Sequence, residues 1–273
     1  MPRIYLFVLF SALAFGQDRE VNFYSEAKEA ALGAQIARQI RIEKRALGSA
    51  AVEDYADRIG RTLAPQLPEY GPGYRFEVFA GAGSRLRAPD MVPGGYIFVP
   101  AELLLAVESE AEFAGMLAHS MAHSAARHGT RMAARGKITD LSSIPLIFMG
   151  GWTGLHGSEM ALAVPLGFLS FLREYELEAD RMAVQAMARA GYDPAALVRY
   201  IERMQTDPTT DKSRKFSPLP PREERLAGLS QAIAELPKLK YYRNTGQYEG
   251  IREEVRGLLQ VQPPTVRPPT LRR

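Results

Sequence analysis

The sequence predicts a mainly helical α+β fold that forms one domain. Between residues 26 and 259, most segments place apolar residues at the three- and four-residue spacing of an amphipathic helix. Two short segments rich in strand formers lie between residues 74 and 99, and together they predict a small sheet. With 273 residues, of which 46% are hydrophobic, the chain can bury a sizeable core.

The first half of this domain is expected to hold two helices and the strands. One helix covers Glu26 to Leu47, with Ser25 placed to cap it, and the next covers Ala50 to Ala64. The stretch from Tyr74 to Ala80 alternates aromatic or aliphatic residues with charged ones, which is typical of a strand. The GGYIFV sequence that follows, bracketed by prolines, is also rich in strand formers.

Helices are expected through the rest of the domain. Glu110 to Arg135 contains three of the four histidines, and Glu159 to Ala190 is helical with a kink or break near Pro165. Pro194 opens another helix. The last two helices are expected over Arg222 to Leu236 and Gly250 to Leu259.

Charge and cysteine content exclude several kinds of site. The net charge is only +3, because 34 basic side chains are dispersed among 31 acidic ones, and this pattern does not favour a nucleic-acid partner. The chain has no cysteine, so disulfides and thiolate metal ligands are excluded. Any metal must therefore be held by histidine and carboxylate groups.

The first residues predict export. Arg3 precedes an apolar run from Ile4 to Phe15, and small residues follow at the positions where a signal peptide is cleaved. The run is short of the about 20 residues that a membrane-spanning helix needs. Residues 1–16 are therefore expected to be a secretory signal peptide, and the mature protein is expected in the bacterial periplasm or envelope.

Beyond the signal peptide, residues 17–260 are expected to form the single domain, and the proline-rich residues 261–273 a disordered tail. Inside the domain, Leu141 to Leu172 is the most apolar region, but prolines and glycines interrupt it. The favoured interpretation is a buried or cleft-lining hairpin. The alternative is a shallow, peripheral membrane contact.

The spacing of two histidines predicts a metal site. His119 and His123 are four residues apart in a helix, so their imidazoles leave the same face one turn apart and can share a tetrahedral zinc ion. A catalytic zinc needs a third protein ligand, which Glu176 on a second helix can supply. Asp180, one turn further on, can accept the spare ring N–H of a ligating histidine. Alone, the acidic residues near Glu176 would be interpreted as a solvated helix face, but together with the histidine pair they favour one zinc ion.

The residue after the first histidine does not fit an active hydrolase. In the zincin pattern H-E-x-x-H, the glutamate at this position takes a proton from zinc-bound water, and here the residue is Ser120. General-base catalysis typically contributes about 10²- to 10⁴-fold to a rate. Glu112 and Glu178 are poorly placed to replace the missing base, because one lies two turns away and the other points away from Glu176. Slow hydrolysis is still physically allowed.

Five segments spread over most of the mature chain belong with the histidine and acidic motifs. They are EAKEAALGAQIARQI, PGGYIFV, EAEFAGMLAHSMAHSAARHG, ELEADRMA and PREERL. They resemble the zinc endopeptidase family that includes the CaaX prenyl protease, a mitochondrial inner-membrane protease and periplasmic quality-control proteases of bacteria. The resemblance implies a gluzincin-type fold, mainly helical with a small mixed sheet, and polypeptide substrates such as misfolded envelope proteins.

The resemblance also assigns roles to residues. It implies that His119, His123 and Glu176 are the zinc ligands and that Asp180 orients a ligand. It implies that an edge strand bordering the cleft binds an extended peptide through Gly95, Tyr96, Ile97, Phe98 and Val99. A second departure accompanies Ser120: where relatives often carry a His-Pro pair, this chain has Leu219 followed by proline.

We therefore expect a metalloendopeptidase-like protein in which catalysis is impaired. The alternatives are a non-catalytic zinc-binding pseudo-protease or chaperone that holds peptides in the groove, and a helical scaffold without metal. Among other polar residues, His128 is expected to have a structural or metal-site-supporting role and His156 a cleft or loop position without chemistry, with direct metal ligation as the alternative for each. Arg222 and Arg225 are expected in ion pairs with acidic residues, with substrate stabilisation as the alternative.

Overall fold

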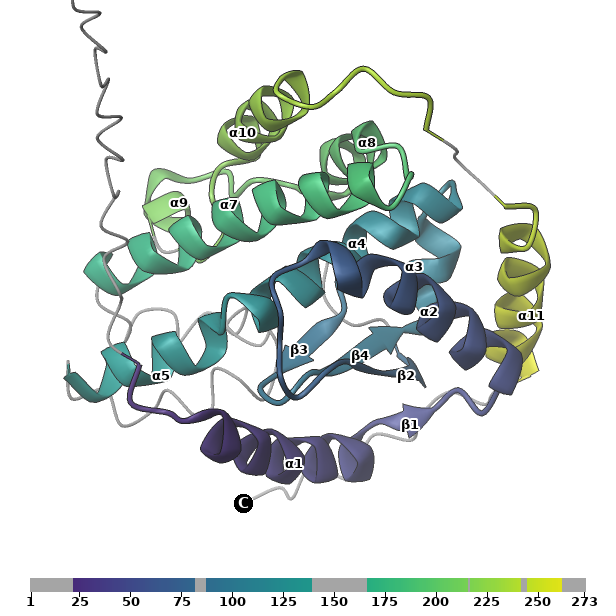
Figure 1. Cartoon of the computed structure of the whole chain (residues 1–273), viewed down its shortest axis with the longest axis horizontal. Helices are drawn as coiled ribbons and strands as arrows, with labels where there is room; N and C mark the ends of the chain where they lie inside the picture. The colour runs from purple at the N-terminus through teal and green to yellow at the C-terminus, as the bar shows by residue number, and fades with distance from the viewer. Residues whose placement is uncertain (1–21, 82–86, 139–165, 216, 242–244, 262–273) are drawn as a thin grey trace, which may run out of the picture.

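The computed structural model describes residues 22–81, 87–138, 166–215, 217–241 and 245–261 (Figure 1). This part of the chain is mainly helical. Its α-helices are α1 Glu26–Glu43, α2 Ala50–Leu63, α3 Ala101–Ala106, α4 Glu110–Ala125, α5 His128–Ile138, α7 Leu166–Arg189, α8 Ala195–Met204, α9 Asp211–Lys215, α10 Arg222–Ala234 and α11 Tyr248–Val261, and a 3₁₀ turn covers Ala64–Gln66. Its strands are β1 Arg45–Ala46, β2 Arg75–Ala80, β3 Asp90–Val92 and β4 Tyr96–Pro100.

The strands form one small mixed sheet in the order β1-β2-β4-β3. β2 and β4 are parallel, whereas β1 pairs antiparallel with β2 and β3 pairs antiparallel with β4. The prediction that Tyr96 to Val99 forms an edge strand is therefore wrong, because β4 is hydrogen-bonded on both sides. The strand at that edge is β3, which the sequence did not predict.

The helix α4 is the centre of the domain. Ser109 caps its first turn by accepting a hydrogen bond from the Glu112 amide, and every residue from Glu110 to Ser124 is buried. A helix buried on all sides needs neighbours all round. α7 packs against it along its length, α8, α2 and β3 also contact it, and Figure 1 shows α7 running beside α4 above the sheet.

The predicted histidine helix, Glu110 to Arg135, is two helices in the structure. α4 ends at Ala125, and Arg127 adopts a left-handed backbone conformation with φ of 56° before α5 begins at His128. The Arg127 guanidinium donates from Nε to Glu29 Oε2 at 2.7 Å and from one Nη to the Tyr24 carbonyl at 2.6 Å. These contacts from the N-terminal segment hold the break, since a left-handed conformation is unfavourable for a residue with a side chain.

Other predicted boundaries differ by small amounts. The first helix ends at Glu43 instead of Leu47, because Lys44 turns into extended backbone and the next two residues pair with β2. The Pro194, Arg222 and Gly250 helices are present as α8, α10 and α11. α3 and α9 were not predicted.

Three predicted features lie wholly or mostly outside the described residues. They are the signal peptide, most of the apolar region Leu141 to Leu172 and the proline-rich tail. Within the part of the chain that the structure describes, no helix combines the length and the apolar character that crossing a membrane requires.

The close approach of α1 to the turn between β3 and β4 depends on a glycine. A Cβ added at Gly33 would lie 1.6 Å from the Pro93 carbonyl oxygen. Gly33 belongs to α1 and Pro93 to the turn between β3 and β4, so the backbone is fixed on both sides of this contact. Gly33 therefore sets how closely α1 packs on the sheet.

We expect Gly33→Ala to lower the free energy of unfolding by about 1–3 kcal/mol, the usual cost of overpacking. Gly228→Ala in α10 is the matched control, because nothing lies within 4 Å of its Cβ position. In that exposed helical position, alanine should stabilise the chain by up to about 1 kcal/mol. Urea unfolding measures both variants, and equal stabilities would contradict the packing argument.

Candidate metal centre

The helices α4 and α7 bring three potential ligands together. His119 and His123 face α7 from successive turns of α4, and Glu176 faces them from α7. The two imidazole Nε2 atoms are 3.2 Å apart. Glu176 places Oε2 3.5 Å from His119 Nε2 and Oε1 3.3 Å from His123 Nε2.

These separations fit a small tetrahedral cation. Donor atoms that lie 2.0–2.1 Å from a tetrahedral zinc ion are about 3.3–3.4 Å from each other. The separations of 3.2, 3.3 and 3.5 Å lie near that value, the last two being measured to different oxygens of Glu176, and one donor atom from each residue lies within 4.8 Å of the others. In addition, Glu176 Oε1 is buried and accepts no hydrogen bond from the described residues. The donor set therefore fits a metal ion with three protein ligands.

The short distances between the two imidazoles and the carboxylates also shift the pKa values of these groups in the metal-free site. Burial alone would lower the pKa of His119, but its contacts with Asp180 and Glu176 raise that pKa to about 9. The pKa of His123 is lowered because burial outweighs its contact with Glu176. Burial would raise the pKa of Glu176, but the two histidines hold it well below the ordinary value. A proton on His119 thus occupies the place where a cation would balance the carboxylates.

Asp180 lies where the sequence placed it, one turn along α7 from Glu176. Its Oδ1 is 2.9 Å from His119 Nδ1, so the ring can donate from Nδ1 and leave Nε2 for a metal. Arg225 of α10 binds the same carboxylate with two hydrogen bonds of 2.7 Å, and its Nη2 is 3.7 Å from Glu176. This guanidinium lowers the pKa of Asp180 against the opposing effect of burial. The prediction of an ion pair between Arg225 and the acidic motif is confirmed.

His128 contacts a predicted ligand although it lies on another helix. The break after α4 brings His128 Nδ1 to 2.9 Å from His123 Nδ1, and His128 Nε2 lies 3.0 Å from Glu178 Oε2. Burial lowers the pKa of His128 to about 4 despite that carboxylate, so the ring is neutral near pH 7. The expectation that His128 supports the metal site agrees with these contacts.

Ser120 faces a small cavity beside the three candidate ligands. Its hydroxyl donates to the Pro89 carbonyl at 3.3 Å, and the cavity has a volume of about 40 Å³. The apolar part of the wall consists of Ala88, Met91, Met116, Ile201 and Leu219.

Among the described residues that line this cavity, Glu176 is the one carboxylate. Glu112 is turned away, because it binds Arg203 through both oxygens at 2.6 and 3.1 Å. Glu178 is engaged by His128. Neither Glu112 nor Glu178 therefore lines this cavity.

The strand beside this cavity is β3, not β4. Met91 of β3 and the two residues before the strand, Ala88 and Pro89, belong to the wall, whereas none of the predicted substrate-binding residues, Gly95 to Val99, does. β4 is one strand further from α4, between β3 and β2. β3 has three residues, which are too few to show the alternating pattern of a strand in the sequence.

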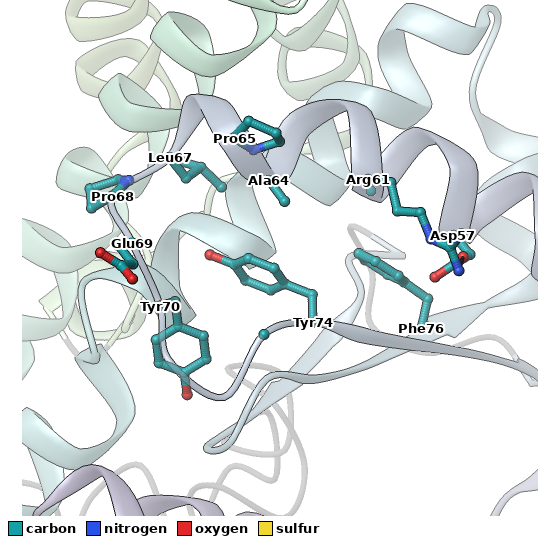
Figure 2. Close-up of a pocket in the computed structure, with 12 residues that line it drawn as sticks. Asp57, Arg61, Ala64, Pro65, Leu67, Pro68, Glu69, Tyr70, Tyr74 and Phe76 are labelled. Atoms are coloured by element: carbon teal, nitrogen blue, oxygen red, sulfur yellow. Dashed lines mark ion pairs between the residues drawn. The ribbon is translucent and has the colours of Figure 1, made fainter.

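A second, larger cavity of about 500 Å³ lies elsewhere, between the C-terminal end of α2 and β2 (Figure 2). Figure 2 shows Tyr74 and Phe76 on one side and the segment from Arg61 to Leu67 on the other. An Asp57–Arg61 ion pair of 2.6 Å lies at its edge. It contains none of the candidate metal ligands.

Comparison with known proteins gives a family match. The model of the family described as "Peptidase family M48" matches residues 75–233, which include β2, the three candidate ligands and Arg225. This segment is more than half of the chain.

Individual relatives agree. The chain is 26% identical over 201 residues to the "Beta-barrel assembly-enhancing protease" of Yersinia pestis, covering 71% of this chain and 40% of the relative. It is 25% identical over 210 residues to the protein of the same name from Escherichia coli strain K12, covering 71% and 39%. It is 32% identical over 115 residues to the "Mitochondrial metalloendopeptidase OMA1" of Schizosaccharomyces pombe, covering 42% and 33%. The chain thus spans about two fifths of the length of the bacterial relatives.

Proposed function

Because the chain belongs to peptidase family M48, we propose that it is an exported, zinc-dependent metalloendopeptidase-like protein that binds polypeptides, with peptide-bond hydrolysis impaired by Ser120. The observation that carries this proposal is a three-ligand set with zinc-like spacing next to a hydroxyl where the base belongs. The family supports peptidase chemistry. The substrate and the degree of impairment are our proposal.

His119, His123 and Glu176 would hold the zinc ion, with Asp180 orienting His119. A zinc ion bound there would polarise a peptide carbonyl and lower the pKa of water to near 7. The Ser120 hydroxyl cannot act as the general base that a glutamate would be. It is neutral and donates a hydrogen bond to the Pro89 carbonyl, so it does not accept a proton near pH 7. Slow, chelator-sensitive hydrolysis is the expected result.

We expect the purified chain to bind one zinc ion, and we expect Glu176→Gln and His119→Ala to lose most of it. Glu174→Gln is the control, because this glutamate lies on the same helix as Glu176 and is exposed. Metal analysis after dialysis measures the stoichiometry, and a zinc-dependent rise in melting temperature gives a second readout. Markedly substoichiometric zinc that does not increase on addition of the metal would contradict the proposal and favour a metal-free scaffold.

We propose that a polypeptide lies along β3 instead of β4. β3 pairs with β4 on one side, and within the described residues no strand pairs with its other side. An extended peptide can add to such an edge through backbone hydrogen bonds, which makes binding tolerant of sequence. Met91 of β3 and the preceding Pro89 line the cavity that Ser120 also lines, which supports this proposal.

The N-terminal sequence and the bacterial relatives support a location in the periplasm or envelope. A charged residue before an apolar run is typical of an exported chain. The relatives named for beta-barrel assembly suggest clients among envelope proteins. The apolar region Leu141 to Leu172 would supply any peripheral membrane contact.

A second function uses the same edge without catalysis. The absence of another described carboxylate in the cavity favours a pseudo-protease or chaperone that holds polypeptides. It predicts peptide binding without turnover.

A further inference from the structure

The two candidate histidine ligands are supported in different ways. The outer nitrogen of His119 faces a carboxylate, with 2.9 Å between His119 Nδ1 and Asp180 Oδ1. The outer nitrogen of His123 faces another imidazole instead, with 2.9 Å between His123 Nδ1 and His128 Nδ1. Of two facing ring nitrogens in a hydrogen bond, one must carry the hydrogen and the other must accept it.

The surroundings of His128 decide between them. His128 Nε2 lies 3.0 Å from Glu178 Oε2, and an ionised carboxylate only accepts. A neutral ring with a metal at His123 Nε2 carries its one hydrogen on Nδ1, so His128 Nδ1 must be the acceptor of this pair. His128 then carries its hydrogen on Nε2, toward Glu178, and His123 Nε2 is directed at Glu176 and His119.

The position of His128 is tightly fixed. The residue is fully buried, and its ring stacks on Tyr175 with 4.3 Å between centroids and 11° between planes. The preceding residue, Arg127, is held in its left-handed conformation by the buried carboxylate of Glu29, which also accepts a hydrogen bond from Thr130. Glu29 belongs to α1, outside the segment that matches the family.

We propose that His128 is a positioning residue for metal binding: it holds His123 in the tautomer and orientation that present Nε2 to the cation, and Glu178 sets the tautomer of His128. This inference rests on the metal site proposed above. His128 itself does not touch the metal or the substrate. It completes a line of contacts from Glu178 through two imidazoles to the site.

The first test uses the unmodified, full chain. Nitrogen-15 NMR of the four histidines in the zinc-loaded protein reports which ring nitrogen carries a hydrogen. We expect hydrogen on His123 Nδ1 and on His128 Nε2, with His128 Nδ1 bare. Bound zinc together with a hydrogen on His128 Nδ1 would overturn this inference alone, whereas failure to bind zinc would overturn the proposed function as well.

The second test separates positioning from packing. His128→Leu removes the acceptor, and we expect zinc affinity to fall about 10- to 100-fold. His128→Asn places a carbonyl oxygen near the position of Nδ1 and should restore most of that affinity, although both variants lose the buried ring. The melting temperature of the metal-free forms measures the packing loss, which should be similar in the two variants.

Two outcomes of a chelator competition assay would overturn the inference. One is equal zinc affinity in the leucine and asparagine variants, and the other is affinity in both that matches the unmodified chain. Glu178→Ala should weaken zinc binding as well. Glu174→Ala is its matched control, because this exposed glutamate lies one turn away on the same helix.

Discussion

Replacing Ser120 by glutamate is expected to raise chelator-sensitive casein hydrolysis by about 10²- to 10⁴-fold, which corresponds to about 3–6 kcal/mol of activation free energy. The physical reason is that a carboxylate at this position can take a proton from the attacking water, which a neutral hydroxyl cannot. The cavity beside Ser120 has a volume of about 40 Å³, so a longer side chain has space next to the three ligands. The substitution removes only one weak hydrogen bond, to the Pro89 carbonyl.

The control for this experiment is Ser120→Gln, which has the size of glutamate and no basic oxygen. It should leave hydrolysis at the level of the unmodified chain. Zinc content must be measured in all three proteins, because a change in metal loading would also change the rate. Equal, robust and chelator-sensitive hydrolysis by the serine and glutamate forms would show that the chain has another general base.

The parts of the site that the sequence predicted depend on local geometry. A four-residue spacing fixes the relative direction of two side chains on any helix, and this holds for the pairs His119 with His123 and Glu176 with Asp180. That these two helices face each other is a tertiary fact. The sequence indicates it only through chemistry, since a catalytic zinc ion needs a third protein ligand, and through the family resemblance.

The parts that the sequence did not predict depend on distant contacts. Two alanines before Arg127 favour a continuing helix, whereas His128, Gly129 and Thr130 after it are weaker helix formers. A carboxylate 98 residues earlier in the chain, that of Glu29, holds the break. β3 has three residues, too few for an alternating pattern, and its place at the edge follows from pairing with β4. The strand nearest the site was therefore assigned incorrectly, although the presence of a small sheet was predicted.

Removing the guanidinium of Arg225 is expected to lower the free energy of unfolding of the metal-free chain by about 3–5 kcal/mol, as for other broken buried ion pairs. Asp180 would keep its charge in a buried place while losing two hydrogen bonds of 2.7 Å, and Gln205 would lose a third contact of 3.0 Å. Urea unfolding of Arg225→Met measures this loss. Arg61→Met is the control. Arg61 also forms an ion pair, of 2.6 Å with Asp57, but its side chain is 81% exposed. It should change stability by about 0–1 kcal/mol.

Arg225→Met also tests whether a bound metal and the Arg225 guanidinium neutralise the same buried carboxylates. Without zinc, two buried carboxylates, Glu176 and Asp180, are balanced by Arg225 and by a proton on His119. Because zinc brings two positive charges to the same carboxylates, zinc should stabilise Arg225→Met more than it stabilises the unmodified chain. Unfolding curves with and without zinc give this difference. A loss no larger than in Arg61→Met, or a gain from zinc that is the same in both proteins, would mean that Arg225 and the metal site are energetically independent.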